Sequence, residues 1–385
     1  MLACQKGEFS LPNDLHYLNC AYMSPLPKRA EAQAIAAVEK SRVPSQYTDD
    51  DWFGVTDRIR DRFAELVHLP DPKRVAIIPS ASYGIATVAA NTPVSSHQNI
   101  VIVEGQFPSN VYSWRRIAGE TGAELRTVGP PDSNDNRGMI WNRHVLESID
   151  ADTAVVALGP VHWSDGTRFD LEAIRDRTSE VDAAFVIDGT QSVGAMPFDA
   201  ELIRPDALVC ASYKWLLGPY CIGVAYYGER YDDGLPIEDS WINREGSENF
   251  SAVASYVDAY QPGARRYDVG EKSHFILGPM LVAAIELLLE WGVDEIQPYC
   301  GELMGEVLDQ ARELGYHVED ESWRAHHLVG IRTPPQVPLD RLQKALADRN
   351  VSVSLRGSAI RVSPHVYNDE HDVASLAEAL EKAIT

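Results

Sequence analysis

Short apolar runs recur through the first two thirds of the chain, and they predict buried β-strands. Each run is four or five residues long, rich in Val, Ile and Ala, and not interrupted by polar residues. Continuous runs of this kind are typical of parallel sheets, whose strands are buried on both faces. The predicted strands are Val75–Ile78, Ile100–Val103, Ala154–Leu158, Ala183–Ile187, Ala207–Cys210 and Gly223–Tyr227.

Helical periodicity appears between several of these strands, for example over Val111–Thr121 and Leu171–Ser179. Alternating strands and helices indicate βαβ units with right-handed crossovers. We therefore expect an α/β fold in which a mostly parallel, doubly wound sheet forms a large domain.

The pattern changes after Gly270, where longer helices and separated strands predict a smaller α+β domain. The expected helices are Pro279–Trp291, Gln297–Leu314 and Asp372–Ile384, and the expected strands are Leu328–Arg332 and Ala359–Val362. We expect residues 1–42 to pack on this small domain, residues 43–270 to form the large domain, and residues 271–385 to form the small one.

Composition restricts the possible partners and location. The 385 residues carry a net charge of −23 with no block of Lys and Arg, which argues against nucleic-acid or anionic-membrane binding. The most apolar stretch, Met280 to Trp291, contains Glu286 and Glu290 and is too short to span a bilayer. The five cysteines are widely spaced, without a metal-binding cluster, so we expect reduced thiols, no metal, and a cytoplasmic protein.

Candidate chemistry follows three of the predicted strands, at the sheet edge where doubly wound folds bind ligands. The strand Val75–Ile78 is followed by small residues that enter a helix, Pro79 to Gly84. The free backbone N–H groups and the dipole of such a helix start suit a phosphate. Many strand-to-helix turns have this composition, so the turn alone does not identify a ligand.

Asp188 and Lys214 follow two other strands. A carboxylate at the end of a buried strand needs a cationic or hydrogen-bonding partner, so Asp188 indicates either a ligand contact or a cap of the next turn. Lys214 lies between the strand Ala207–Cys210 and the apolar Trp215 to Leu217. Burial there would lower its pKa and make the amine nucleophilic, although most lysines are solvated surface charges.

These features together suit pyridoxal 5'-phosphate. That cofactor needs an amine for a Schiff base, a carboxylate at its pyridine nitrogen, a phosphate-binding turn and usually an aromatic ring stacked on it. Lys214, Asp188, the turn Ser80–Ser82 and Phe107 would supply the four contacts.

The most specific segments are Asp188-Gly-Thr-Gln-Ser-Val-Gly194 and Ser212-Tyr-Lys-Trp215, followed by Gly218-Pro219. By these motifs the chain resembles the class V aminotransferase family of fold-type I pyridoxal-phosphate enzymes. That family includes cysteine desulfurases, kynureninases and isopenicillin N epimerase-like proteins. The resemblance covers nearly the whole chain, and it implies a homodimer whose active sites lie at the subunit boundary.

The resemblance also assigns cofactor contacts. Lys214 would form the Schiff base and shuttle the Cα proton, and Asp188 would pair with the pyridine nitrogen. Gln191 would lie near the ring oxygen. The stretch around Gly270 matches a phosphate-binding segment of the partner subunit, but Glu271 replaces the usual Thr. The other expected cofactor-binding residues are Ser80, Ala81, Ser82, Phe107, Ser212 and Tyr213.

On the substrate side, the resemblance implies that Arg361 clamps the α-carboxylate through two parallel hydrogen bonds. Asn19 and Tyr22 belong to a segment that would line the substrate pocket. Trp241, with Arg244 near it, would face the substrate from the second subunit, or simply pack.

One position departs from the family pattern. Trp163 replaces a family Asn, and His162 beside it is either a substrate-side acid or base or a structural histidine.

We expect an enzyme that acts at the Cα of an amino acid, with transamination first because it needs no extra nucleophile. A C–S or C–C lyase or an amino-acid epimerase would use the same residues. Asn350 to Ile360 contains no cysteine, which argues against persulfide-forming desulfuration. A non-catalytic cofactor-binding protein is the remaining alternative, and the presence of Lys214, Asp188 and Arg361 argues against it.

Overall fold

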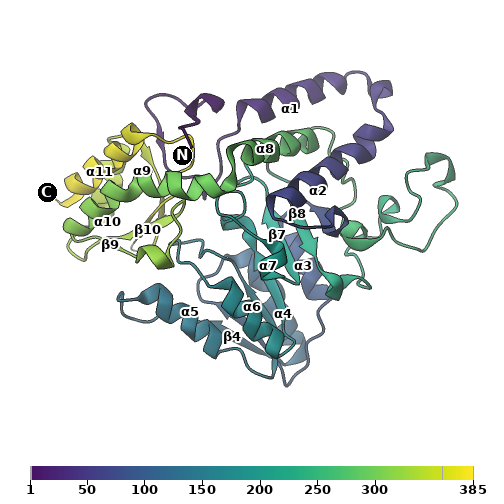
Figure 1. Cartoon of the computed structure of the whole chain (residues 1–385), viewed down its shortest axis with the longest axis horizontal. Coiled ribbons are helices and arrows are strands. Elements are labelled where there is room, and N and C mark those ends of the chain that lie inside the picture. Colours follow the sequence, from purple (N-terminus) through teal and green to yellow (C-terminus); the bar gives the residue numbers. More distant parts are fainter. Residues whose placement is uncertain (1, 358, 385) are drawn as a thin grey trace.

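The computed structural model describes residues 2–357 and 359–384. Figure 1 shows a large sheet-containing part in the middle, and a smaller part at the left that contains the C-terminal elements. Within residues 2–357 and 359–384, no helix is long and apolar enough to cross a lipid bilayer.

The large part contains a seven-stranded sheet. Its strands, in the spatial order β2-β8-β7-β6-β5-β3-β4, are β2 (Val75–Ile78), β8 (Gly223–Tyr227), β7 (Ala207–Ala211), β6 (Ala184–Asp188), β5 (Thr153–Leu158), β3 (Asn99–Val103) and β4 (Glu124–Val128). Strand β8 is antiparallel to both neighbours, and the other neighbouring pairs are parallel. All six strands predicted from apolar runs are present.

Sequence reading missed β4 because this strand lies at the sheet edge. Its residues, Glu-Leu-Arg-Thr-Val, are exposed or half-buried, so they form no apolar run.

Helices cover both faces of the sheet, which confirms the doubly wound arrangement. Alternate residues of each strand enter two separate cores, as the pleat of a strand requires. Helices α2 (Val55–Leu66), α5 (Arg137–Glu147), α6 (Leu171–Glu180) and α8 (Leu277–Trp291) contribute to one core, and α3 (Ala81–Ala90) and α4 (Tyr112–Thr121) contribute to the other. The short helix α7 (Ala200–Ile203) leads into β7.

The smaller α+β part is confirmed. Its antiparallel sheet has the order β12-β13-β10-β9 and packs with three helices around a third core. The elements are β9 (His317–Val318), β10 (Val329–Arg332), β12 (Ser354–Arg356), β13 (Ala359–Val362), α9 (Val293–Glu313), α10 (Leu339–Ala347) and α11 (Glu370–Ile384).

The N-terminal segment contacts both parts. Strand β1 (His16–Tyr17) pairs with β11 (Val351–Ser352), whereas α1 (Lys28–Lys40) packs along α8. Helix α8 is apolar on nearly every side and also packs on α2 of the large part. The proposed boundaries at residues 42 and 270 stay a prediction, because packing runs across both of them.

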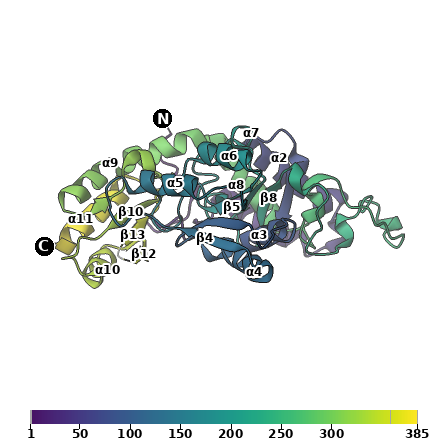
Figure 2. The same ribbon diagram turned by 90° about the horizontal axis from the view of Figure 1, so that it is seen from below.

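A long segment between β8 and α8 projects beyond the large sheet (Figure 2). It carries exposed apolar side chains, including Trp241, Phe250 and Tyr256.

Candidate active site

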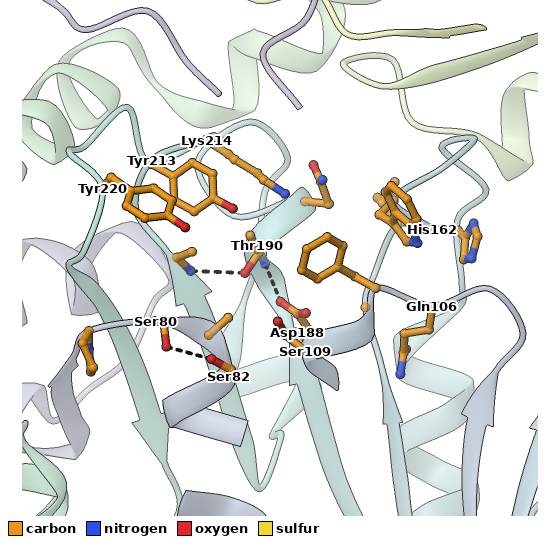
Figure 3. Close-up of a pocket in the computed structure, with 18 of the residues that line it drawn as sticks. Ser80, Ser82, Gln106, Ser109, His162, Asp188, Thr190, Tyr213, Lys214 and Tyr220 are labelled. Atoms are coloured by element: carbon orange, nitrogen blue, oxygen red, sulfur yellow. Dashed lines mark hydrogen bonds between the residues drawn. The ribbon is translucent and has the colours of Figure 1, made fainter. Parts of the chain in front are cut away.

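A cavity of about 310 Å³ opens at the carboxyl ends of the parallel strands. Figure 3 shows Lys214 and Asp188 pointing into it, with Ser80 and Ser82 at one side and His162 at the other. The expected site residues that line the cavity are Ser80, Ala81, Ser82, Phe107, His162, Asp188, Gln191, Tyr213 and Lys214. They lie at the carboxyl ends of β2, β3, β5, β6 and β7 or in the segments that directly follow these strands.

Lys214 lies in the turn after β7 and is only 5% exposed to solvent. Its Nζ is 5.2 Å from the ring centre of Phe107 and 5.5 Å from that of Tyr213. Among the described residues, no side chain or carbonyl accepts a hydrogen bond from this amine. Burial and repulsion by Arg361 lower the pKa of Lys214 to about 8, although attraction by Asp188 opposes this shift. A larger fraction of the amine is therefore neutral and nucleophilic near pH 7 than for a surface lysine.

This pKa predicts the pH dependence of cofactor loading. Only the neutral amine of Lys214 attacks an aldehyde, so the loading rate should rise with pH around a midpoint of about 8, rather than 10.5. Arg361→Gln removes a like charge and should move the midpoint to higher pH, whereas the surface variant Arg341→Gln should not. The measurement is the rate at which the visible cofactor band appears in apoprotein as a function of pH. A wild-type midpoint near 10.5 would contradict the geometry.

Asp188 ends β6 and accepts a hydrogen bond from the backbone N–H of Thr190 at 3.1 Å. The Thr190 hydroxyl in turn accepts the backbone N–H of Ala211 at 3.1 Å, which ties the ends of β6 and β7 together. Burial raises the pKa of Asp188, although the Thr190 hydrogen bonds and the charge of Lys214 oppose this. A carboxylate in this environment favours a cationic hydrogen-bond donor, such as a protonated pyridine nitrogen.

The start of α3 provides an anion-binding turn. Ser80 caps this ten-residue helix by accepting the backbone N–H of Tyr83 at 3.2 Å, and its Oγ is 2.9 Å from Ser82 Oγ. Ala81 lines the cavity at the same place. The unpaired backbone N–H groups and the dipole of the first turn favour a phosphate here.

Ser212 does not line the cavity. Its hydroxyl lies within hydrogen-bonding distance of the carbonyl groups of Pro219 (2.6 Å) and Ile222 (2.7 Å). A Cβ atom on Gly218 would lie 2.8 Å from the Ser212 side chain, so the turn requires glycine there. This placement argues against the expected cofactor contact and gives Ser212 a role in shaping the turn that carries Lys214.

Gln191 lines the cavity, but its side-chain amide already forms hydrogen bonds with other residues of the protein. Its Nε2 donates to the carbonyl of Ala21 at 3.2 Å, and its Oε1 accepts the indole N–H of Trp215 at 3.0 Å. Gln191 thereby joins the N-terminal segment to the Lys214 turn.

His162, for which we expected either a substrate-side acid or base or a structural histidine, lines the cavity. Its Nε2 is 3.1 Å from the carbonyl of Glu104, so this nitrogen donates, and its Nδ1 is 2.9 Å from Ser164 Oγ. Asp165 is 3.3 Å from the same Nδ1. Both ring nitrogens therefore have partners inside the protein. The arrangement supports the structural alternative for His162.

Arg361 lies beside the cavity, against the ring of Trp163, and is 1% exposed. It donates to the carbonyl of Trp163 at 2.9 Å and to Ser354 Oγ at 3.3 Å. Within residues 2–357 and 359–384, no carboxylate forms an ion pair with it. Burial, with repulsion from Arg356, lowers its pKa to about 10. A buried cation without a counter-ion indicates an anionic ligand.

The other expected substrate and partner residues are outside the cavity wall. Asn19 is buried and accepts the Ser354 hydroxyl at 2.8 Å, so it supports Arg361 indirectly. Tyr22 is 61% exposed, and Trp241 packs against Trp52 and Phe250. The N–H of Gly270 donates to Glu238 at 2.7 Å. Roles for Tyr22, Trp241 and Gly270 in a second subunit's site stay predictions.

Sequence reading missed several residues of this region. Thr190, Tyr220 and Cys221 line the cavity, and Cys221 has a φ of +69°. Arg356 lies against Trp163 beside Arg361. Thr190 was detectable from its place in the Asp188 motif, and Arg356 from its five-residue spacing to Arg361. Tyr220 and Cys221 come close only because the chain turns back between β7 and β8.

The arrangement fits pyridoxal 5'-phosphate. An amine without a partner, a carboxylate that favours a cation, an anion-binding helix start and an aromatic ring face one cavity, and these are the contacts that the cofactor requires. Lys214 would hold its aldehyde carbon, Asp188 its ring nitrogen, and the Ser80–Ser82 turn its phosphate.

Comparison with known proteins identifies the family. The model of the family Aminotransferase class-V matches residues 53–376. The chain therefore belongs to the class-V aminotransferases, which confirms the resemblance read from the Asp188 and Lys214 motifs.

Two relatives illustrate the range of this similarity. The "Uncharacterized aminotransferase YcbU" of Bacillus subtilis is 25% identical over 320 residues, which cover 83% of this chain and 81% of that protein. A kynureninase of Geobacillus thermodenitrificans is 22% identical over 98% of this chain and 90% of its own.

Solved structures confirm the fold-type I architecture. A mutant of the protein C-DES, with glycine covalently linked to its PLP cofactor, has a TM-score of 0.85 and 17% identity, over 98% of both chains. The cysteine desulfurase CsdA of Escherichia coli has a TM-score of 0.81 and 18% identity, over 98% of this chain and 97% of its own.

Proposed function

We propose that this protein is a pyridoxal-phosphate-dependent enzyme that catalyses transamination of an amino acid. Its cofactor is pyridoxal 5'-phosphate, and family membership supports an enzyme. The observation that carries the proposal is the buried amine of Lys214 in the cavity, which has no hydrogen-bond or ion-pair partner among the described residues. The charges of Asp188 and of Arg361 both act on this amine. The other basic side chain of the described cavity wall, His162, has protein partners at both ring nitrogens, which leaves the Lys214 amine to move a substrate proton.

Arg361, Lys214 and Asp188 have different roles in the proposed reaction. Arg361 binds and orients the α-carboxylate of the amino acid. When bound, the cofactor withdraws electrons from Cα and retains the amino group. Lys214 Nζ removes the proton from Cα and holds it so that it can be given back later in the reaction. Transamination needs only this one base. Asp188 would hold the ring nitrogen of the cofactor in its protonated form.

A lyase is the second candidate, and one observation favours it. The rings of Tyr213 and Tyr220 lie 4.7 Å apart and both line the cavity. A phenol in this position can donate a proton to a departing side-chain fragment, as C–S or C–C cleavage requires. Relatives named as a kynureninase and a probable cysteine desulfurase are consistent with this alternative. Epimerisation needs a second acid or base on the opposite face of the substrate Cα. His162 is not free for this role, because both of its ring nitrogens have protein partners.

A half-reaction experiment separates transamination from cleavage. Protein loaded with pyridoxal 5'-phosphate is mixed with one amino acid at a time, without a keto-acid acceptor. Transamination predicts one keto acid per site, conversion of the cofactor to pyridoxamine 5'-phosphate, and then arrest until a keto acid is added. Repeated turnover with release of ammonia or a side-chain fragment would instead establish a lyase and reject transamination. Tyr213→Phe and Tyr220→Phe serve as matched variants, which should impair cleavage more than transamination.

A further inference from the structure

A second arginine lies beside Arg361. Arg356 is on β12 and Arg361 is on β13, and these strands pair with Ser354 opposite Arg361. Side chains two apart on a strand lie on the same face, and cross-strand partners share that face. Ser354, Arg356 and Arg361 therefore point to the same side of the hairpin. The guanidinium carbons of Arg356 and Arg361 lie 5.0 and 5.8 Å from the ring centre of Trp163, which lines the cavity.

Neither arginine has a carboxylate partner among the described residues. Arg356 donates to the carbonyl of Leu355 at 2.7 Å, and its Nε is buried without a partner. Arg137 and Arg332, by contrast, both bind the carboxylate of Asp165, at 3.0 and 2.8 Å. In a protein with 57 acidic residues and a net charge of −23, two adjacent unpaired arginines mark a locally positive region.

A single substrate carboxylate would pair with only one of the two arginines. Arg356 and Arg361 both repel the protonated Lys214, and Arg356 also acts on Arg361. Asp188 faces this group of cations from within the cavity, and it is needed at the ring nitrogen. One α-carboxylate would neutralise Arg361 and leave Arg356 without a counter-ion.

We propose that Arg356 binds a second anionic group, so that the preferred substrate is an amino acid with an acidic side chain. The class includes amino dicarboxylates and their sulfinate, sulfonate or phosphate analogues, because a guanidinium binds all of these through paired hydrogen bonds. This inference deepens the proposed function and rests on it for the amino-acid part. Trp163 would hold both guanidinium groups in place by cation–π contact.

Matched acid and amide substrates test the side-chain specificity. The value of kcat/KM is measured for aspartate against asparagine and glutamate against glutamine, in wild type, Arg356→Gln, Arg356→Lys and the surface control Arg341→Gln. For whichever of aspartate and glutamate is the faster substrate, wild type should have a higher kcat/KM than for the matching amide. Arg356→Gln should lower this acid-to-amide ratio of kcat/KM roughly 10- to 100-fold, mainly by raising KM for the acid. Arg356→Lys should retain part of the preference, and Arg341→Gln all of it. Equal ratios in wild type and Arg356→Gln would overturn the inference.

A binding measurement on apoprotein is independent of turnover. Titration calorimetry compares succinate, which has two carboxylates, with butanoate, which has one. Succinate should bind more tightly to wild type, and Arg356→Gln should remove the difference. Equal binding of the two acids by wild type would reject a second anion site.

The outcomes for the two proposals are distinguishable. Failure to form a visible cofactor band, or to release a keto acid from any amino acid, would reject the proposed function and leave the succinate result to stand alone. Turnover of neutral amino acids as fast as acidic ones would reject the inference only. A lower assembly mass for Arg356→Gln, with an unchanged acid-to-amide ratio, would place Arg356 in a subunit contact and also reject it.

Discussion

Lys214→Ala is expected to abolish the visible cofactor band and to lower turnover by at least roughly 10³-fold, because the same amine holds the cofactor and moves the Cα proton. The fold should remain intact. Nζ has no hydrogen-bond or ion-pair partner among the described residues, and burial already disfavours its charge. Removing the side chain therefore breaks no hydrogen bond or ion pair, and only its contacts with the rings of Phe107 and Tyr213 are lost. Absorbance after loading, turnover and thermal unfolding of apoprotein measure the three effects.

A surface lysine provides the control for this variant. Lys344 lies on α10 with its side chain 75% exposed, so Lys344→Ala should keep the band and the turnover. A Lys214→Ala protein that keeps both would refute the assignment of Lys214. Loss of the band together with a large fall in unfolding temperature would show that Lys214 supports the fold instead.

Asp188→Asn is expected to lower turnover roughly 10²- to 10³-fold, the usual cost of removing one preorganised electrostatic contact from an active site. The amide can still accept the Thr190 N–H, so local geometry is kept. What is lost is the negative charge that stabilises a protonated ring nitrogen. Because burial raises the pKa of Asp188, the neutral amide should leave apoprotein as stable as wild type or more stable. Turnover and apoprotein unfolding temperature are the two measurements.

Asp199→Asn is the matched control for Asp188→Asn. Asp199 also accepts backbone N–H groups at the start of a helical turn, but it is more exposed and outside the cavity. Its replacement should leave turnover and stability close to wild type, because an asparagine amide oxygen still caps the helical turn. Equal turnover in Asp188→Asn and wild type would remove Asp188 from the cofactor site.

Much of the fold was predictable because its strongest signals are local. Strands β2 and β8 match their apolar runs at both ends, because runs this short are too brief for a typical helix and suit a strand buried on both faces. Strand β4 was not predictable, because its edge position leaves its side chains partly exposed. The packing of α1 on α8 also lay outside the reach of a local pattern, since it joins segments about 250 residues apart.

The candidate site divides in the same way. Lys214, Asp188 and the turn Ser80–Ser82 were predictable, because each follows a recognisable buried strand and chemistry of this kind collects at one sheet edge. His162 and Ser212 were placed by sequence near the right region. Their hydrogen-bond partners, however, come from Glu104, Ser164, Pro219 and Ile222, and no spacing rule specifies such contacts.

The sequence by itself determined the fold class, the family and the central pair of Lys214 and Asp188, because hydrophobic pattern and short motifs are properties of neighbouring residues. The tertiary structure alone decided which polar atoms remain unpaired. It showed that His162 and Gln191 are already bonded, and that Arg356 and Arg361 lie together against Trp163 without a carboxylate among the described residues. Pairing depends on atoms brought together from distant segments, so only the folded chain reveals which charges are left for a ligand.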